Sequence, residues 1–306
     1  MTATTPSNTQ VAVIGLGSMG YGMAQSLLRA GFTVNGFDTR PEVVARFTAQ
    51  GGVGAASPAE ATREADIVIV VVVNADQTEQ VLLGDMGILT QIKHGAAVVS
   101  CATMAPDRAR AFATAVERAG KHYVDAPISG GAQRAAEGAL TILASGSAAA
   151  IKQAQPALDA MAAKLYLLGD KAGIGASFKI VNQLLAGVHI AAACEAITFA
   201  QKLGLDIAKV YEVITASAGN SWMFENRVPH VLEGDYQPRS AVEIFTKDLG
   251  IIADISRGEK FATPIASSAL QMFLMTASAG MGKDDDASVA RLYAQISGLE
   301  LPGAKG

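Results

Sequence analysis

The sequence predicts a doubly wound α/β sheet followed by an all-helical domain, with one long helix joining the two. Two observations support this prediction. Apolar, β-branched segments alternate with helical patterns in the first part of the chain, and no strand pattern returns after about Gly173. Such alternation is typical of a mostly parallel sheet that binds its ligand at the carboxyl ends of the strands. We therefore expect a sheet domain over residues 1–172 and a helical domain over residues 173–306.

Length and composition indicate a compact enzyme of one or two domains, since the chain has 306 residues of which 50% are hydrophobic and 17% charged. A formal net charge of -4 gives no general electrostatic reason to bind nucleic acid or an anionic membrane. The first nine residues lack the basic segment and apolar core of a signal peptide, so we expect a loose tail. Cys101 and Cys194 are expected to be buried free thiols, which suits a cytoplasmic protein.

The predicted strands are short apolar runs at residues 11–14, 33–37, 66–73, 96–100, 122–125, 139–145 and 165–168. The run at residues 67–73 is too short to span a bilayer and is interpreted as a buried strand. Helical patterns lie between most strands, as at residues 106–119 and 148–161. The remainder is expected to be helical at residues 173–204, 207–218, 221–232, 241–259, 265–279 and 285–296.

A glycine-rich turn follows the first predicted strand and opens a helix, with the sequence Gly15-Leu16-Gly17-Ser18-Met19-Gly20. Gly15 permits a tight turn, Gly17 lets the backbone approach a pyrophosphate, and Gly20 allows close packing of helix against strand. The helix N-terminus attracts the phosphates. A strand before the motif and a helix after it therefore predict a Rossmann dinucleotide site, with a plain glycine turn as the alternative.

The second predicted strand ends at Asp38, where an acidic residue is expected to bind the adenosine ribose hydroxyls and to repel a 2′-phosphate. Arg40 follows closely and could receive that phosphate. Because Asp38 occupies the nearer position, the sequence favours NAD over NADP. Thr39, Val73 and Asn74, at the ends of the second and third predicted strands, complete the predicted cofactor contacts of this domain.

Polar side chains near the start of the long apolar helix are candidates for the chemistry. Lys179, Asn182 and Gln183 have i, i+3 and i+4 spacing, which places them on one face. The positive end of the helix macrodipole disfavours a second positive charge, so the pKa of Lys179 is expected to fall. An amine of this kind can exchange protons near neutral pH. The alternative is a solvated lysine whose stem covers apolar surface.

Three loops carry further candidate residues. The first, SCATMAP at residues 100–106, offers the hydroxyl of Thr103 before a helix, where it could also be part of an N-cap. The second, DAPISGG at residues 125–131, joins Ser129 to Gly130 and Gly131, whose N–H groups could hold an anion or form a plain turn. The third, FTKDL at residues 245–249, contains Lys247, which in a helix is usually a surface charge.

Taken together, these motifs resemble the β-hydroxyacid dehydrogenase family, which includes 3-hydroxyisobutyrate, tartronate semialdehyde and glyoxylate reductase types. The resemblance implies that Lys179 is the catalytic acid/base and that Asn182 assists it. Ser129, Gly130 and Gly131, with Asn182, would hold the substrate carboxylate and hydroxyl, and Thr103 and Lys247 would lie at the nicotinamide end of NAD. It also implies a homodimer or homotetramer built on the helical domain. With four histidines and no clustered ligand spacing, we expect no metal.

Departures from the family pattern indicate one particular branch of the family. Gln183 stands where many members have a second asparagine, and Arg134 stands where glycine is common, so both are predicted substrate contacts. The string around Trp222 and the segment AGMGKDDDASV resemble the L-threonate dehydrogenase branch. This resemblance implies NAD-dependent oxidation of the C2 hydroxyl of a small sugar acid, L-threonate. The alternatives are a reductase of tartronate semialdehyde or another short semialdehyde, and a cofactor-binding scaffold that has lost its chemistry.

Overall fold

The computed structural model describes residues 9–302 and divides into two compact units, Met1–Ile180 and Val181–Gly306. The division falls within helix α8 (Ile174–Lys202). The loose tail expected for the first nine residues lies outside the described residues, apart from residue 9. Each unit is described below by itself.

The first unit is built on one nine-stranded sheet in the order β3-β2-β1-β4-β5-β6-β8-β7, with β9 paired to β8. Pairing is parallel from β3 to β6 and between β8 and β9, while β8 runs antiparallel to β6 and β7. The order 3-2-1-4-5-6 reverses direction between β1 and β4, where doubly wound sheets bind dinucleotides. The strands are β1 (Gln10–Ile14), β2 (Thr33–Phe37), β3 (Val53–Gly54), β4 (Ile67–Val70), β5 (Ala97–Ser100), β6 (His122–Asp125), β7 (Ile128–Ser129), β8 (Leu140–Ser145) and β9 (Ala162–Gly169).

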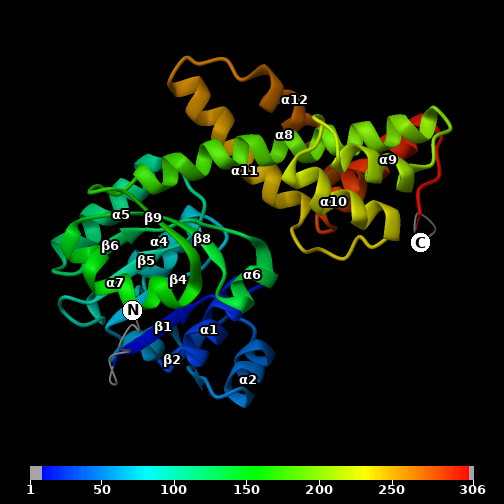
Figure 1. Cartoon of the computed structure of the whole chain (residues 1–306). Helices are drawn as coiled ribbons and strands as arrows, with labels where there is room; N and C mark the ends of the chain where they lie inside the picture. Colours follow the sequence, from blue (N-terminus) through cyan, green and yellow to red (C-terminus); the bar gives the residue numbers. More distant parts are fainter. Residues whose placement is uncertain (1–8, 303–306) are drawn as a thin grey trace. The chain divides into compact units, whose positions relative to one another are not determined.

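Helices cover both faces of the sheet (Figure 1). Strand side chains alternate between the faces, so Val11 and Val13 of β1 pack with α1, α2, α6 and α7, whereas Ala12 and Ile14 pack with α3, α4 and α5. These helices are α1 (Gly20–Arg29), α2 (Pro41–Ala49), α3 (Pro58–Thr62), α4 (Ala75–Leu83), α5 (Pro106–Arg118), α6 (Gly131–Glu137) and α7 (Ala148–Met161), with a 3₁₀ turn at Ile88–Thr90. The predicted fold class is confirmed.

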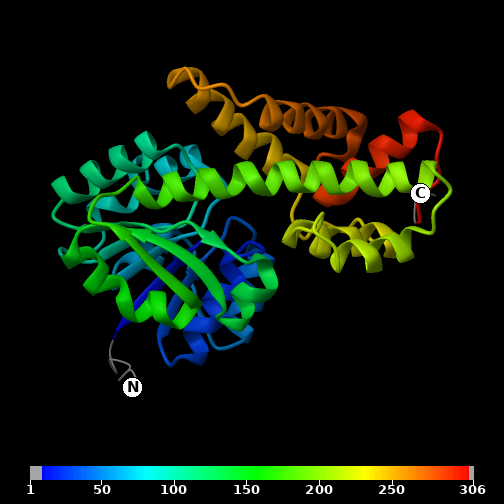
Figure 2. The ribbon, with the colours of Figure 1, turned by 45° about the horizontal axis from the view of Figure 1, so that its top comes forward.

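Helix α8 is one unbroken helix of 29 residues (Figure 2). Gly204 ends it as predicted, because its φ of +76° is open to glycine and its N–H bonds back to the Gln201 carbonyl. By length and composition α8 could span a membrane, but half of the apolar window is buried inside the protein. Burial of this kind is typical of the core helix of a globular protein.

The regular structure in the described part of the second unit is helical, as predicted, apart from one isolated bridge between Ala241 and Asp285. Its helices are α9 (Ile207–Thr215), α10 (Trp222–Glu233), α11 (Val242–Gly258), α12 (Pro264–Thr276) and α13 (Val289–Ser297), with a π segment at Ala277–Met281 and a 3₁₀ turn at Asp286–Ser288. Gly187 of α8 packs tightly on α11, because a Cβ there would lie 2.9 Å from Leu249. Phe245 of α11 stacks on Phe273 of α12 with ring centroids 5.1 Å apart.

A buried polar network ties α10 to the segment before α13. The Asp285 carboxylate accepts hydrogen bonds from His230 Nδ1 at 2.8 Å and from the backbone N–H of Arg239 at 3.0 Å. Arg239 Nη1 lies 2.6 Å from His230 Nε2, which fits a neutral imidazole that donates from Nδ1. Burial raises the pKa of Asp285, but the hydrogen bond from His230 and two backbone donors lower it, and the net direction is downward.

We expect Asp285→Ala to lower the free energy of unfolding by about 3–5 kcal/mol at pH 7, because it leaves buried donors without an acceptor. The folded pKa of Asp285 lies below its ordinary value of 3.8. Its contribution is therefore present above that value and is lost as the pH falls through the folded pKa. The difference between wild type and variant should accordingly shrink below about pH 4. Trp222, the only tryptophan, begins α10 and reports urea unfolding of this unit by fluorescence.

Asp254→Ala is the matched control, since Asp254 is an exposed carboxylate on α11 paired with Arg257. Its loss should cost less than about 1 kcal/mol. Equal destabilisation by the two substitutions would contradict a structural role for the buried network.

Candidate active site

The glycine turn leaves no room for side chains at two of its three glycines. Gly15 has a φ of +97°, and a Cβ there would lie 2.3 Å from the Val71 carbonyl oxygen. A Cβ at Gly20 would lie 1.9 Å from the Gly15 oxygen, whereas at Gly17 nothing lies closer than 4.0 Å. No side chain caps the start of α1. A turn with an open position beside uncapped helix N–H groups fits a pyrophosphate.

Asp38, at the end of β2, joins the glycine turn to Arg40. Its carboxylate accepts from the Leu16 N–H at 2.8 Å and from the Arg40 N–H at 3.0 Å, while Arg40 Nε and Nη2 donate to the two oxygens at 3.0 and 3.3 Å. Burial raises the pKa of Asp38, but the hydrogen bonds and charge of Arg40 and the Leu16 N–H lower it, and the net direction is downward. The carboxylate that is predicted to bind a ribose is thus paired with the arginine.

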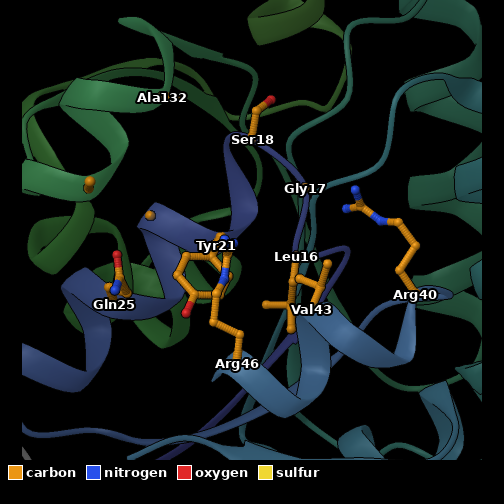
Figure 3. Close-up of a pocket in the computed structure, with 11 residues that line it drawn as sticks. Leu16, Gly17, Ser18, Tyr21, Gln25, Arg40, Val43, Arg46 and Ala132 are labelled. Atoms are coloured by element: carbon orange, nitrogen blue, oxygen red, sulfur yellow. The ribbon is translucent and has the colours of Figure 1, made fainter. Parts of the chain in front are cut away.

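A pocket of about 410 Å³ lies beside this turn (Figure 3). The Arg40 guanidinium points toward Gly17, and Arg46 covers the ring of Tyr21 at 4.0 Å. The pocket therefore places two cations and an aromatic ring beside the predicted phosphate site. Its lining residues come from the turn, α1, α2 and α6: Leu16, Gly17, Ser18, Tyr21, Gly22, Gln25, Arg40, Val43, Arg46, Ala132 and Ala136.

Other predicted cofactor residues lie at the ends of the neighbouring strands. Asn74 caps α4, because its Oδ1 accepts from the Gln77 N–H at 2.8 Å, and Val73 before it is exposed. Thr103 lies between β5 and α5 but does not cap α5, whose N-cap is Ala105. Thr39 is exposed next to Asp38. The parallel order of β2, β1, β4 and β5 brings all these strand ends to one edge of the sheet.

Lys179 is buried, with 7% of its surface exposed, and its Nζ donates to the Ile128 carbonyl at 2.8 Å. Ile128 belongs to β7, within the predicted substrate loop. The structure therefore brings the candidate acid/base to that loop. Such burial argues against the alternative of a solvated surface lysine.

Asp125, which sequence reasoning did not select, anchors the start of α8. Its Oδ2 accepts from the backbone N–H groups of Gly173 and Ala176, both at 2.8 Å. Ser145 Oγ donates to the same oxygen at 3.4 Å and accepts from the Gly175 N–H at 2.9 Å. Burial raises the pKa of Asp125, and these donors only partly offset it. An aspartate as helix cap is a common signal, but this one lies 48 residues before Gly173.

Gly130 and Gly131 follow Ser129 with positive φ values of 139° and 77°. Successive backbone N–H groups in such conformations can form an anion-binding concavity. Arg134 lies over this turn, because a Cβ at Gly130 would be 3.0 Å from its stem. Arg134 is exposed and forms no ion pair within residues 9–302, so its guanidinium is available to a ligand.

In the second unit, Gln183 and Lys247 both meet Asp248 of α11. Gln183 Nε2 donates to Asp248 Oδ2 at 2.5 Å, and Lys247 Nζ lies 2.6 Å from Asp248 Oδ1. Asn182 Nδ2 in turn donates to Gln183 Oε1 at 3.0 Å. Asp248 was also missed by sequence reasoning, although it directly follows Lys247.

The two cysteines are free and buried, as predicted. Burial and the Asp125 charge raise the pKa of the Cys101 thiol to about 12, and burial raises that of Cys194. Neither thiol is therefore poised as a nucleophile. Within the described part of the chain, no three His, Cys, Asp or Glu side chains gather as metal ligands.

Two protein families match successive parts of the chain. The NAD binding domain of 6-phosphogluconate dehydrogenase matches residues 10–169. The family described as the NAD-binding of NADP-dependent 3-hydroxyisobutyrate dehydrogenase matches residues 173–293. The first match contains the glycine turn and Asp38, and the second contains Lys179 and Asp248.

Individual proteins are similar over nearly the whole chain. L-threonate dehydrogenase from Cupriavidus necator is 52% identical over 96% of this chain and 98% of its own length. L-threonate dehydrogenase from Escherichia coli strain K12 is 45% identical over 98% of this chain and 99% of its own length. A crystal structure of 3-hydroxyisobutyrate dehydrogenase from Salmonella typhimurium is 46% identical and superposes with a TM-score of 0.89, covering 93% of this chain and all of that one.

The ion pair at the end of β2 generates a prediction about cofactor choice. Asp38→Ala should shift the ratio of kcat/KM for NAD to that for NADP toward NADP by roughly tenfold or more, because it removes a charge-assisted acceptor and releases Arg40. Arg40→Ala should shift the same ratio toward NAD. Initial rates at varied NAD and NADP measure both. A wild-type preference for NADP, or equal shifts in both variants, would show that this pair does not set the choice.

Proposed function

The chain belongs to the 3-hydroxyisobutyrate dehydrogenase-like family, and we propose that it oxidises the C2 hydroxyl of L-threonate to 2-dehydro-L-erythronate. As a member of that family, it is a dehydrogenase that acts on a CH–OH group with a nicotinamide dinucleotide, NAD. The relatives named L-threonate dehydrogenase support the substrate. The observation that carries the chemistry is the buried Lys179, whose Nζ is held against the substrate loop by the Ile128 carbonyl.

Proton transfer is assigned to Lys179. The bound nicotinamide supplies the acceptor for the hydride that leaves C2. A neutral Lys179 can donate one N–H to the Ile128 carbonyl and still direct its lone pair at the C2 hydroxyl, whose proton it takes. In the reverse direction the ammonium returns this proton and stabilises negative charge on the oxygen. The Ile128 bond thus orients the amine in both protonation states.

The substrate carboxylate is assigned to the turn after Ser129. The N–H groups of Gly130 and Gly131 and the Ser129 hydroxyl offer neutral donors for one anion. Arg134 offers a charged donor on the same turn and could bind a carboxylate with two nitrogens. Because the net charge of the chain is -4, binding of an acid must depend on such local groups.

The cofactor would lie along the glycine turn and the ends of β1 and β4. Gly17 and the start of α1 would face the pyrophosphate, and Asp38 the adenosine ribose. Thr103 and Lys247 are proposed to face the nicotinamide end, as the family resemblance implies. Val73 and Asn74 would lie between these two ends.

A homodimer or homotetramer in the cytoplasm is also proposed. Large apolar side chains remain exposed in the single chain, which supports association through the helical unit. On α8 and α12 these include Val181, Leu185, Phe199, Ile265 and Leu274.

The substrate is tested by initial rates with NAD and NADP on L-threonate, D-threonate, D-erythronate, D-glycerate and 3-hydroxyisobutyrate. We expect the highest kcat/KM for L-threonate with NAD. Faster reduction of tartronate semialdehyde by NADH would favour the alternative reductase. Inactivity with the whole panel would favour a scaffold without chemistry.

Lys179→Ala should lower kcat by roughly two to four powers of ten while leaving the Kd of NAD nearly unchanged, because it removes only the proton-transfer group. Lys202→Ala is the matched control, since Lys202 is an exposed lysine on the same helix whose Nζ also donates to a carbonyl, that of Ser297. Steady-state rates and titration of NAD by fluorescence measure the two quantities. An unaltered kcat in Lys179→Ala would remove this residue from the mechanism.

A further inference from the structure

A chain of polar side chains crosses the packed helices α8 and α11. It begins with Lys247 Nζ, which lies 2.6 Å from Asp248 Oδ1 in an ion-pair contact without hydrogen-bond geometry. It continues from Asp248 Oδ2 to Gln183 Nε2 at 2.5 Å, and from Gln183 Oε1 to Asn182 Nδ2 at 3.0 Å. Asp248 and Gln183 are buried, whereas Asn182 is exposed. This row of side chains therefore connects the buried Asp248 carboxylate to the exposed amide of Asn182.

The direction of every bond in this chain follows from the carboxylate. Asp248, paired with a lysine, can only accept, so Gln183 must present its Nε2 to Asp248 and its Oε1 to Asn182. Asn182 must then present its Nδ2 to Gln183. Asn182 Oδ1 has no hydrogen-bond partner within residues 9–302, and the second N–H of Nδ2 also remains. Asn182 thus offers a hydrogen-bond acceptor to whatever meets it.

We propose that Asp248 and Gln183 are positioning residues that fix the Asn182 amide so that its Oδ1 accepts from a substrate hydroxyl. A carboxylate cannot supply that hydrogen, so Asn182 Oδ1 does not bind the acid group. The reacting C2 hydroxyl gives its only hydrogen to Lys179, one turn earlier on the same helix. The donor must therefore be a second hydroxyl, on C3 or C4. This rests on the proposed function and narrows its substrate class to acids with at least two hydroxyls.

In this arrangement Gln183 positions Asn182 and does not itself contact the substrate. Both polar atoms of its amide are already bonded, to Asp248 and to Asn182, and only 7% of the residue is exposed. This burial leaves a ligand little access to the amide. Gln183 accordingly acts through Asn182, and Asp248 acts through Gln183.

The test pairs substrate analogues with variants. L-threonate is compared with its 3-deoxy and 4-deoxy counterparts, 2,4-dihydroxybutanoate and 2,3-dihydroxybutanoate of matching configuration. In the wild type one deoxy acid should lose about tenfold in kcat/KM, the effect of one hydrogen bond with an unpaired acceptor left behind. In Asp248→Asn that loss should shrink to about twofold. An amide at position 248 can donate as well as accept, so the amides of Gln183 and Asn182 can rotate and exchange the positions of their oxygen and nitrogen atoms.

The double variant Gln183→Glu/Asp248→Asn supplies the rescue. The amide at position 248 then donates to a carboxylate at position 183, which accepts from Asn182 Nδ2 and keeps Oδ1 facing outward. The tenfold loss should return in this double variant and should be unchanged in Asp254→Asn, an exposed control on the same helix. Equal deoxy losses in wild type and folded Asp248→Asn, or no return in a double variant with wild-type Tm, would overturn the inference.

Failure of the proposed function is distinguishable from failure of this inference. If the wild type prefers another dihydroxy acid, L-threonate is replaced by that acid and its deoxy analogue, and the same variants are compared. A preferred substrate with a single hydroxyl, such as 3-hydroxyisobutyrate, would overturn the inference while leaving the assignment of Lys179 intact.

Discussion

The buried Asp125 carboxylate joins the end of β6 to the start of α8, and the position of the candidate acid/base depends on this junction. Oδ2 accepts from the Gly173 and Ala176 N–H groups at 2.8 Å. Charge-assisted bonds of this kind contribute about 1.5–3 kcal/mol each, and a carboxylate at a helix N-terminus is further favoured by the macrodipole. A second contact runs from Lys179 Nζ to the Ile128 carbonyl. The start of α8 is thus held at two points, by the end of β6 and by β7.

This junction changes the electrostatic setting that the sequence suggests for α8. Sequence reasoning placed Lys179 near the bare positive end of a helix macrodipole. In the structure a carboxylate occupies that end, so part of the positive potential is offset. The fold also supplies Lys179 with burial and with an oriented hydrogen bond to the Ile128 carbonyl. Orientation of the amine does not depend on its charge, which suits a group that must both take and return a proton.

Features encoded by neighbouring residues could be predicted from the sequence, and features encoded by distant ones could not. The glycine turn, Asp38 and the end of α8 at Gly204 follow from local spacing and backbone conformation. Strands β3 and β7 have two residues each, too few to form a pattern. The anchoring contact of Asp125 spans 48 residues and that of Asp248 with Gln183 spans 65. Only folding brings such partners together.

The departure at position 183 and the orientation of Asn182 have one physical cause. An asparagine there would carry its amide one C–C bond, about 1.5 Å, closer to the α8 backbone. Gln183 reaches Asp248 at 2.5 Å and holds Asn182 at 3.0 Å, and a shorter side chain on the same backbone would end farther from Asp248. The extra methylene of glutamine spans the distance between α8 and a carboxylate on α11, where Gly187 lets the two helices approach. A longer side chain whose own amide is bonded at both atoms can thus determine which hydrogen-bonding atom its neighbour presents.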